Sequence, residues 1–119
     1  MFSLLIADDS AGVRAAIRTV VGAVADRVVE CGDGLRAVAL YDEMKPDWVF
    51  MDVSMPHLDG ISATRRIRQA HPTARVVIVT DHGDKEMRQA AVDAGATAFV
   101  TKDDIVTLAD VLTDGGVAR

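Results

Sequence analysis

The sequence holds a single cysteine, Cys31, among its 119 residues. One cysteine excludes an internal disulfide and any metal site built on several thiolates. The chain also lacks an apolar run that approaches the roughly 18 residues of a membrane span, and no basic leader precedes an apolar segment at its start. We therefore expect a cytoplasmic protein that makes no contact with a membrane.

Positive charge is scarce as well, because 13 Lys and Arg stand against 18 Asp and Glu, for a net charge of −5. An acidic domain repels nucleic-acid phosphates and anionic lipids, so we expect no direct nucleic-acid binding by this chain. The length suits one domain with a buried core. We expect that domain over residues 1–113, followed by a flexible tail or the start of a linker over 114–119.

Short, continuous apolar runs rich in β-branched residues recur along the chain. They do not alternate polar with apolar residues, which is typical of strands that are covered on both faces, as in a parallel sheet. The runs lie at residues 4–7, 27–29, 48–51, 75–79 and 98–100.

Helical patterns separate these runs. The first carries apolar residues at spacings of three and four from Val13 to Val24, and Ser10 can cap it. Asp33 and Asp59 can cap the next two patterns, a fourth pattern runs from Asp84 to Ala94, and a short last helix follows the fifth run. Five strands alternating with five helices predict a doubly wound α/β domain of three layers, because right-handed crossovers place helices on both faces of the sheet.

In such folds the site lies outside the carboxyl ends of the strands. Polar residues end or follow four of the predicted strands: Asp8, Asp9, Asp52, Thr80 and Lys102. Three carboxylates close together repel one another or recruit a cation. Oxygen ligands without cysteine or a suitably spaced histidine pair favour Mg²⁺.

The same edge has the groups that phosphoryl transfer needs. The Thr80 hydroxyl and the Lys102 ammonium can contact phosphoryl oxygens, and one carboxylate can attack phosphorus as a nucleophile. Chemistry of this kind depends on positioning and on charge neutralisation.

Four motifs in order resemble the receiver domain of two-component response regulators. They are Asp8-Asp9, the segment MDVSMPHLDG at residues 51–60, Val79-Thr80, and the segment GATAFVTK at residues 95–102. Asp103-Asp104 after Lys102, where proline is common, resembles the LuxR/NarL-like subgroup, and we expect both aspartates to cap the last helix. The resemblance covers nearly the whole chain and implies a flavodoxin-like five-stranded parallel sheet of order 2-1-3-4-5.

The resemblance also implies roles for single residues. Asp52 would accept a phosphoryl group from a sensor histidine kinase or a phosphotransfer protein. Thr80 and Lys102 would contact that group. The Mg²⁺ ligands would be Asp8, Asp9, Asp52 and the backbone carbonyl of Ser54.

The implied output is a change of shape. Thr80 would move towards the phosphoryl group and Phe99 would turn inward, which remodels the face of the fourth helix, the fifth strand and the last helix. That face would control an output domain or partner, in transcription if a C-terminal domain follows, and a homodimer is possible. The chain would then be a signalling switch and no enzyme beyond self-phosphorylation and autodephosphorylation.

Other interpretations remain open at this stage. Asp81 and the short last helix suit a pseudo-receiver, which keeps the fold as an interaction module without phosphorylation. A haloacid-dehalogenase-like phosphatase needs a second aspartate where Ser54 stands, and a flavodoxin-like FMN carrier needs a phosphate loop after the first strand. For Phe99 the alternative is a plain core position.

Overall fold

The computed structural model describes residues 2–114 of the chain, which form five strands and five α-helices in strict alternation, with one 3-10 helix before the last. The elements are β1 (Phe2–Ala7), α1 (Ala11–Val21), β2 (Ala25–Cys31), α2 (Gly34–Met44), β3 (Trp48–Met51), α3 (Gly60–Ala70), β4 (Val76–Thr80), α4 (Lys85–Ala94), β5 (Ala98–Thr101), the 3-10 helix η1 (Lys102–Thr107) and α5 (Leu108–Asp114).

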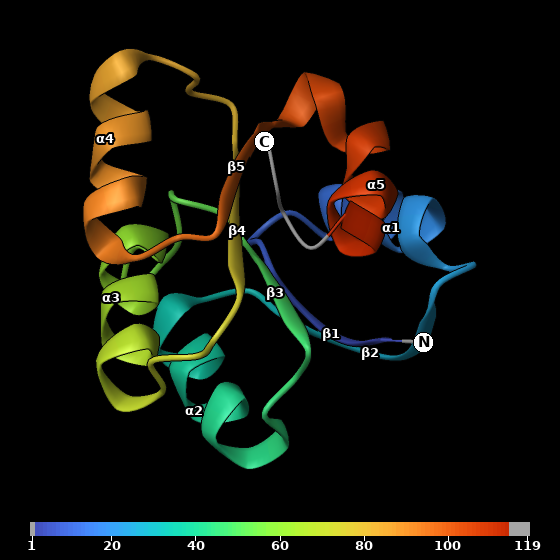
Figure 1. Cartoon of the computed structure of the whole chain (residues 1–119), viewed down its shortest axis with the longest axis horizontal. Coiled ribbons are helices and arrows are strands. Elements are labelled where there is room, and N and C mark those ends of the chain that lie inside the picture. Colours follow the sequence, from blue (N-terminus) through green and yellow to red (C-terminus); the bar gives the residue numbers. More distant parts are fainter. Residues whose placement is uncertain (1, 115–119) are drawn as a thin grey trace.

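The strands form one parallel sheet in the order β2-β1-β3-β4-β5. Helices α1 and α5 cover one face of it, and α2, α3 and α4 cover the other (Figure 1). The doubly wound fold and its strand order are therefore confirmed. Among the described residues, no helix combines the length and the apolar character that crossing a membrane requires.

The core is divided in two by the sheet. Successive residues of a strand face opposite sides, so Leu5 and Val49 pack with α2, α3 and α4, whereas Leu4 and Trp48 pack with α1 and α5. All four residues have no exposed surface. Apolar residues at every position of the central strands are explained by this two-sided burial.

The predicted helix starts are confirmed at four positions. The side chains of Ser10, Asp33, Asp59 and Asp84 each accept a hydrogen bond from a backbone N–H in the first turn of the following helix. Gly95 ends α4 with φ 95°, a left-handed conformation that glycine adopts without a side-chain clash.

Several predicted boundaries were wrong. Strand β2 extends beyond residues 27–29 because an edge strand is half exposed and admits polar residues such as Asp26. Helix α1 ends at Val21, so Val24 lies outside it. The expected tail begins inside α5, which includes Asp114, and residues 115–119 lie outside the described part.

The expected capping of the last helix by Asp103 and Asp104 was also wrong. The segment after β5 starts as a 3-10 helix whose N-cap residue, Thr101, makes no side-chain capping bond. The Thr101 hydroxyl instead donates to the Asp103 carboxylate at 2.5 Å. Asp103 is therefore occupied with a neighbouring side chain rather than with a backbone N–H of the helix.

Candidate functional site

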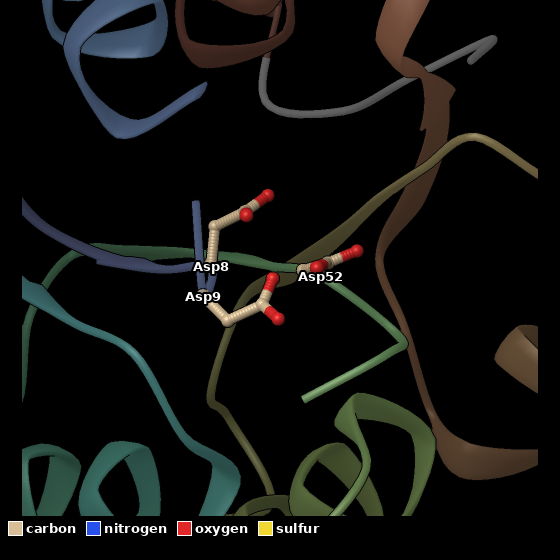
Figure 2. A group of neighbouring side chains, drawn as sticks. All are labelled: Asp8, Asp9 and Asp52. Carbon is tan, nitrogen blue, oxygen red and sulfur yellow. The ribbon is translucent and has the colours of Figure 1, made fainter. Parts of the chain in front are cut away.

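Three carboxylates meet where two central strands end. Asp8 and Asp9 follow β1, and Asp52 follows β3, whose residue Met51 pairs with Ala7. One ligand oxygen from each carboxylate lies within 4.8 Å of the other two (Figure 2). Asp8 and Asp52 are buried, whereas Asp9 is exposed. The predicted convergence at this sheet edge is therefore present.

The start of α1 holds Asp8 in place. Its Oδ1 accepts a hydrogen bond from the Ser10 N–H at 2.9 Å, and the Ser10 hydroxyl accepts one from the Val13 N–H at 3.2 Å. The cap of the helix and the turn that carries the acid are thus one local structure.

Asp52 is fixed through its backbone and through one side-chain oxygen. Its N–H donates to the Ala7 carbonyl at 2.8 Å, and its Oδ1 accepts from the Val53 N–H at 2.9 Å. No hydrogen bond to Asp52 Oδ2 is present within residues 2–114. That oxygen therefore remains available for other chemistry.

The loop after Asp52 depends on Gly60. The Gly60 N–H donates to the Val53 carbonyl at 2.8 Å, and a Cβ at this position would lie 1.7 Å from the Asp52 carbonyl oxygen. Only a residue without a side chain lets α3 begin so close to the acceptor's backbone.

Lys102 supplies the positive charge. Its ammonium nitrogen lies 3.0 Å from Asp8 Oδ2 and 3.3 Å from Asp52 Oδ1. Burial lowers the pKa of Lys102, but the two carboxylates raise it more, so its pKa is raised overall. The ammonium is therefore a fixed cation between the two buried acids.

The surroundings of the Asp52 carboxyl disfavour its ionised form. Burial raises its pKa, and the neighbouring Asp8 raises it further, while Lys102 opposes both effects. The ionised form that a nucleophile needs is therefore costly in this protein without a further cation.

The cluster fits a hard divalent cation. Three acids face one lysine, and the fully buried Oδ2 of Asp8 has only that lysine as a partner within the described chain. The donors are all oxygen atoms, which Mg²⁺ prefers. Mg²⁺ would add the positive charge that the cluster lacks.

The remaining predicted residues make other contacts. Thr80 ends β4, is buried, and accepts a hydrogen bond from the His82 N–H at 3.2 Å. Ser54 follows Asp52 by two residues and is exposed. Phe99 lies half-buried on β5, and the Arg88 guanidinium lies over its ring at 4.6 Å from the ring centre.

Two arginines of the site were missed by sequence reasoning. Arg14 donates to the Asp8 carbonyl at 2.6 Å, and Arg88 stacks on Phe99 and donates to the Gly83 carbonyl at 3.1 Å. The available signal for Arg14 was weak, because it is one of two basic residues in the first helix, with Arg18, and directly follows Val13 of the apolar stripe.

Known sequences are similar to this chain over most of its length. The family described as "Response regulator receiver domain" matches residues 4–113. Chemotaxis protein CheY of Listeria monocytogenes is 38% identical over 103 residues, which cover 86% of this chain and 87% of that protein. The transcriptional regulatory protein YhcZ of Bacillus subtilis is 38% identical over 102 residues, 84% of this chain but 48% of that protein.

Solved structures are similar over nearly the whole chain. A LuxR-family two-component response regulator from Aurantimonas sp. has a TM-score of 0.90 at 34% identity, covering 100% of this chain and 87% of that one. A CheX-CheY-BeF3-Mg complex from Borrelia burgdorferi has a TM-score of 0.89 at 25% identity, covering 98% and 90%.

Proposed function

The chain belongs to the family of response regulator receiver domains of two-component signalling, and we propose that Asp52 is its phosphoryl acceptor. The observation that carries the proposal is the convergence of Asp8, Asp9 and Asp52 at one edge of the sheet, with Lys102 bridging Asp8 and Asp52. A buried carboxylate beside a fixed cation suits attack on the phosphorus of a phosphoryl group whose oxygens carry negative charge.

The reaction exchanges one bond to phosphorus for another. Asp52 Oδ2, which accepts no hydrogen bond from the described residues, attacks the phosphorus of a phosphohistidine or a small acyl phosphate. The bond from phosphorus to the donor breaks, its electron pair leaves with the donor, and an aspartyl phosphate forms. Lys102 stabilises the phosphoryl oxygens as a compact cation.

We assign Mg²⁺ to the carboxylates of Asp8, Asp9 and Asp52 and to the backbone carbonyl of Ser54. When bound, Mg²⁺ supplies charge neutralisation and orientation of phosphoryl oxygens. Asp8 and Asp52 are held by the backbone contacts described above, so the chain presents the ligands without a large rearrangement.

Phosphorylation is proposed to act on Thr80 and Phe99. An aspartyl phosphate adds about two negative charges and new acceptor oxygens, and the Thr80 hydroxyl is the donor we assign to one of them. Phe99 borders a cavity of about 160 Å³ with Arg88 and Thr101. Movement of Thr80 lets Phe99 turn into space beside β5, which remodels the α4–β5–α5 face.

The proposed donor is a sensor histidine kinase or a phosphotransfer protein, in the cytoplasm. The chain is about 30% identical to sporulation initiation phosphotransferase F of Bacillus subtilis, over 110 residues. The chain spans about half the length of its relative YhcZ. For a longer protein we therefore propose that this domain controls an attached output domain in transcription. For the isolated domain the corresponding proposal is dimerisation through the remodelled face.

Phosphorylation kinetics test this function. Wild type and Asp52→Asn are incubated with acetyl phosphate, with and without Mg²⁺, and phosphoprotein is measured by intact mass. We expect a gain of one phosphoryl group in wild type with Mg²⁺ and none in Asp52→Asn. Asp26→Asn, a change at an exposed acid of β2, is the matched control and should be labelled like wild type. Absence of labelling in folded wild type at saturating Mg²⁺ would favour the pseudo-receiver.

A further inference from the structure

We propose that Arg14 is a positioning residue for the metal site, holding the peptide between Asp8 and Asp9 in the orientation that cation binding needs. The inference deepens the proposed function and rests on it, since the group being positioned is the acidic pair assigned to Mg²⁺. Arg14 lies near the start of α1, and its hydrogen bonds go to the Glu30 carboxylate and to the Asp8 backbone rather than to either carboxylate of that pair.

The contact that carries the inference is short and directed at the backbone. A terminal nitrogen of the Arg14 guanidinium donates to the Asp8 carbonyl oxygen at 2.6 Å. That carbonyl belongs to the peptide bond that joins Asp8 to Asp9, and a peptide is planar. Fixing the oxygen therefore fixes the plane from which both acidic side chains project.

The guanidinium is itself held from a second strand. Arg14 Nε donates to Glu30 Oε1 at 2.9 Å, so one planar group ties the end of β1 to Glu30 near the end of β2. The backbone of Gly32 lies beside this bridge, since a Cβ there would be in ordinary van der Waals contact with the Arg14 nitrogen at 3.7 Å and with the Asp9 Cα at 3.8 Å. The planar fork of arginine makes both bonds at once from two separate nitrogens, whereas a lysine has one donor nitrogen on a flexible stem.

Arg18 provides a natural comparison within the same helix. It lies one turn after Arg14, and its Nε donates to the other oxygen of Glu30 at 2.8 Å. Its guanidinium also donates to the Val28 carbonyl at 3.5 Å and not to the acidic pair. Loss of Arg18 therefore removes a guanidinium and a Glu30 contact while leaving the Asp8 carbonyl bonded.

The test compares Arg14→Gln, Arg14→Lys and Arg18→Gln with wild type in two measurements. Mg²⁺ affinity is measured by calorimetric titration of the metal-free protein, and amide exchange at Ser10 is measured by NMR without metal. The Ser10 N–H donates to Asp8 Oδ1, so its exchange reports the turn that Arg14 is proposed to hold.

We expect Arg14→Gln to weaken Mg²⁺ binding about tenfold, the usual effect of losing a group that orients metal ligands, and to speed Ser10 exchange. Arg14→Lys should lie between Gln and wild type. Arg18→Gln should keep wild-type Mg²⁺ affinity and Ser10 exchange, even if its unfolding free energy falls. If Arg14→Gln does not fold, Arg14→Lys decides the question by the same two measurements.

Wild-type Mg²⁺ affinity in the folded Arg14 variants would overturn the inference and leave the proposed function standing, as would equal weakening by Arg18→Gln. Failure of wild type to bind Mg²⁺ would instead overturn the proposed metal site, and the inference with it.

Discussion

At the scale of single residues, the site is a balance between charges that repel and one that attracts. Asp8 and Asp52 are both buried and both ion-paired to Lys102. Burial raises the pKa of Asp52, and Asp8 adds to that effect. In the metal-free domain, the repulsion between these two buried carboxylates is therefore unfavourable for stability, although the proposed function needs both groups.

Asp52→Asn is expected to raise the free energy of unfolding of the metal-free protein by about 1 kcal/mol at neutral pH, because it removes a buried charge and its repulsion with Asp8. Urea unfolding followed by the fluorescence of the single, fully buried Trp48 measures it. Asp26→Asn, at an exposed position, should change stability by less than about 0.5 kcal/mol.

The same pKa shift fixes the sign of the pH dependence. Because the pKa of Asp52 is higher in the folded chain than in the unfolded one, the folded chain binds more protons between the two values. The contribution of Asp52 to the free energy of unfolding therefore falls as pH rises through that window. The gain in unfolding free energy from Asp52→Asn should shrink as pH falls below this window. A lower unfolding free energy of Asp52→Asn than of wild type at neutral pH would contradict this electrostatic explanation.

Lys102→Met tests the attraction between the Lys102 ammonium and the two buried carboxylates. Removing the ammonium leaves Asp8 and Asp52 facing each other without a cation, which should lower the free energy of unfolding by about 2 kcal/mol. Lys85→Met, at an exposed residue of α4, is the control and should have little effect. In the double variant with Asp52→Asn the loss should be smaller than in Lys102→Met alone, since a buried repulsion is gone. Strictly additive effects would argue against the ion pair.

Sequence reasoning found the acids and the lysine because they stand directly at strand ends, where chain position determines spatial position. It did not find Arg14, because that contact runs from a helix to a backbone carbonyl and depends on the length and direction of a flexible side chain. Nor could it give the ion-pair geometry of Lys102, since the residue lies on η1, a segment whose 3-10 conformation was not predicted.

At the scale of elements, the packing of α3 against the end of β3 sets the position of the acceptor. Helix α3 begins at Gly60, where a Cβ would meet the Asp52 carbonyl oxygen. Helix α1 begins one residue after Ser10, whose amide holds the Asp8 carboxylate. The acidic cluster is therefore positioned by two helix starts and two strand ends.

Gly60→Ala is expected to lower the free energy of unfolding by about 3 kcal/mol, because the added methyl overlaps backbone atoms that cannot move independently. Gly12→Ala is the matched control. A Cβ at Gly12 has 3.8 Å to its nearest neighbour, and alanine is the better helix former there. That variant should gain about 0.5–1 kcal/mol. Urea unfolding of both variants measures the difference, and similar stabilities would contradict the proposed close approach.

The boundaries of β3 were predictable because its burial is complete, whereas the apolar run at residues 75–79 stops before Thr80, the buried polar residue that ends β4. Strand β3 occupies residues 48–51 as predicted, because all four of its residues are apolar and buried between helices on both faces. Strand β2 was underestimated because it is at the edge of the sheet and exposes Asp26 and Arg27. The end of α1 was misplaced because Val24 packs against the core from the loop, which an apolar pattern alone cannot distinguish from a further helical turn.

At the scale of the whole molecule, the alternation of strands and helices determines where the site can be. Parallel strands all end at the same edge, and the order β2-β1-β3-β4-β5 places β1 beside β3 at the centre. Acids that follow these two strands must meet, whatever their distance in sequence. Strand order itself came from the family resemblance, because local periodicity does not say which strands are neighbours.

Binding of Mg²⁺ should stabilise the whole domain. At a free concentration of 100 times the dissociation constant, the gain in unfolding free energy is about 2.7 kcal/mol. Urea unfolding with and without Mg²⁺ measures it. Asp9→Asn should lose most of the gain, while Asp33→Asn, at the N-cap of α2 and not a member of the carboxylate cluster, should retain it. An equal gain in both variants would place the ion elsewhere.

The identity of the phosphorylated residue is the most direct test of the central claim. Wild type is labelled with acetyl phosphate and Mg²⁺, the aspartyl phosphate is reduced with borohydride to homoserine, and the peptides are sequenced by mass spectrometry. We predict homoserine at position 52 and at no other aspartate. Unmodified Asp52 in protein that carries a phosphoryl group elsewhere would contradict the assignment of Asp52 as the acceptor.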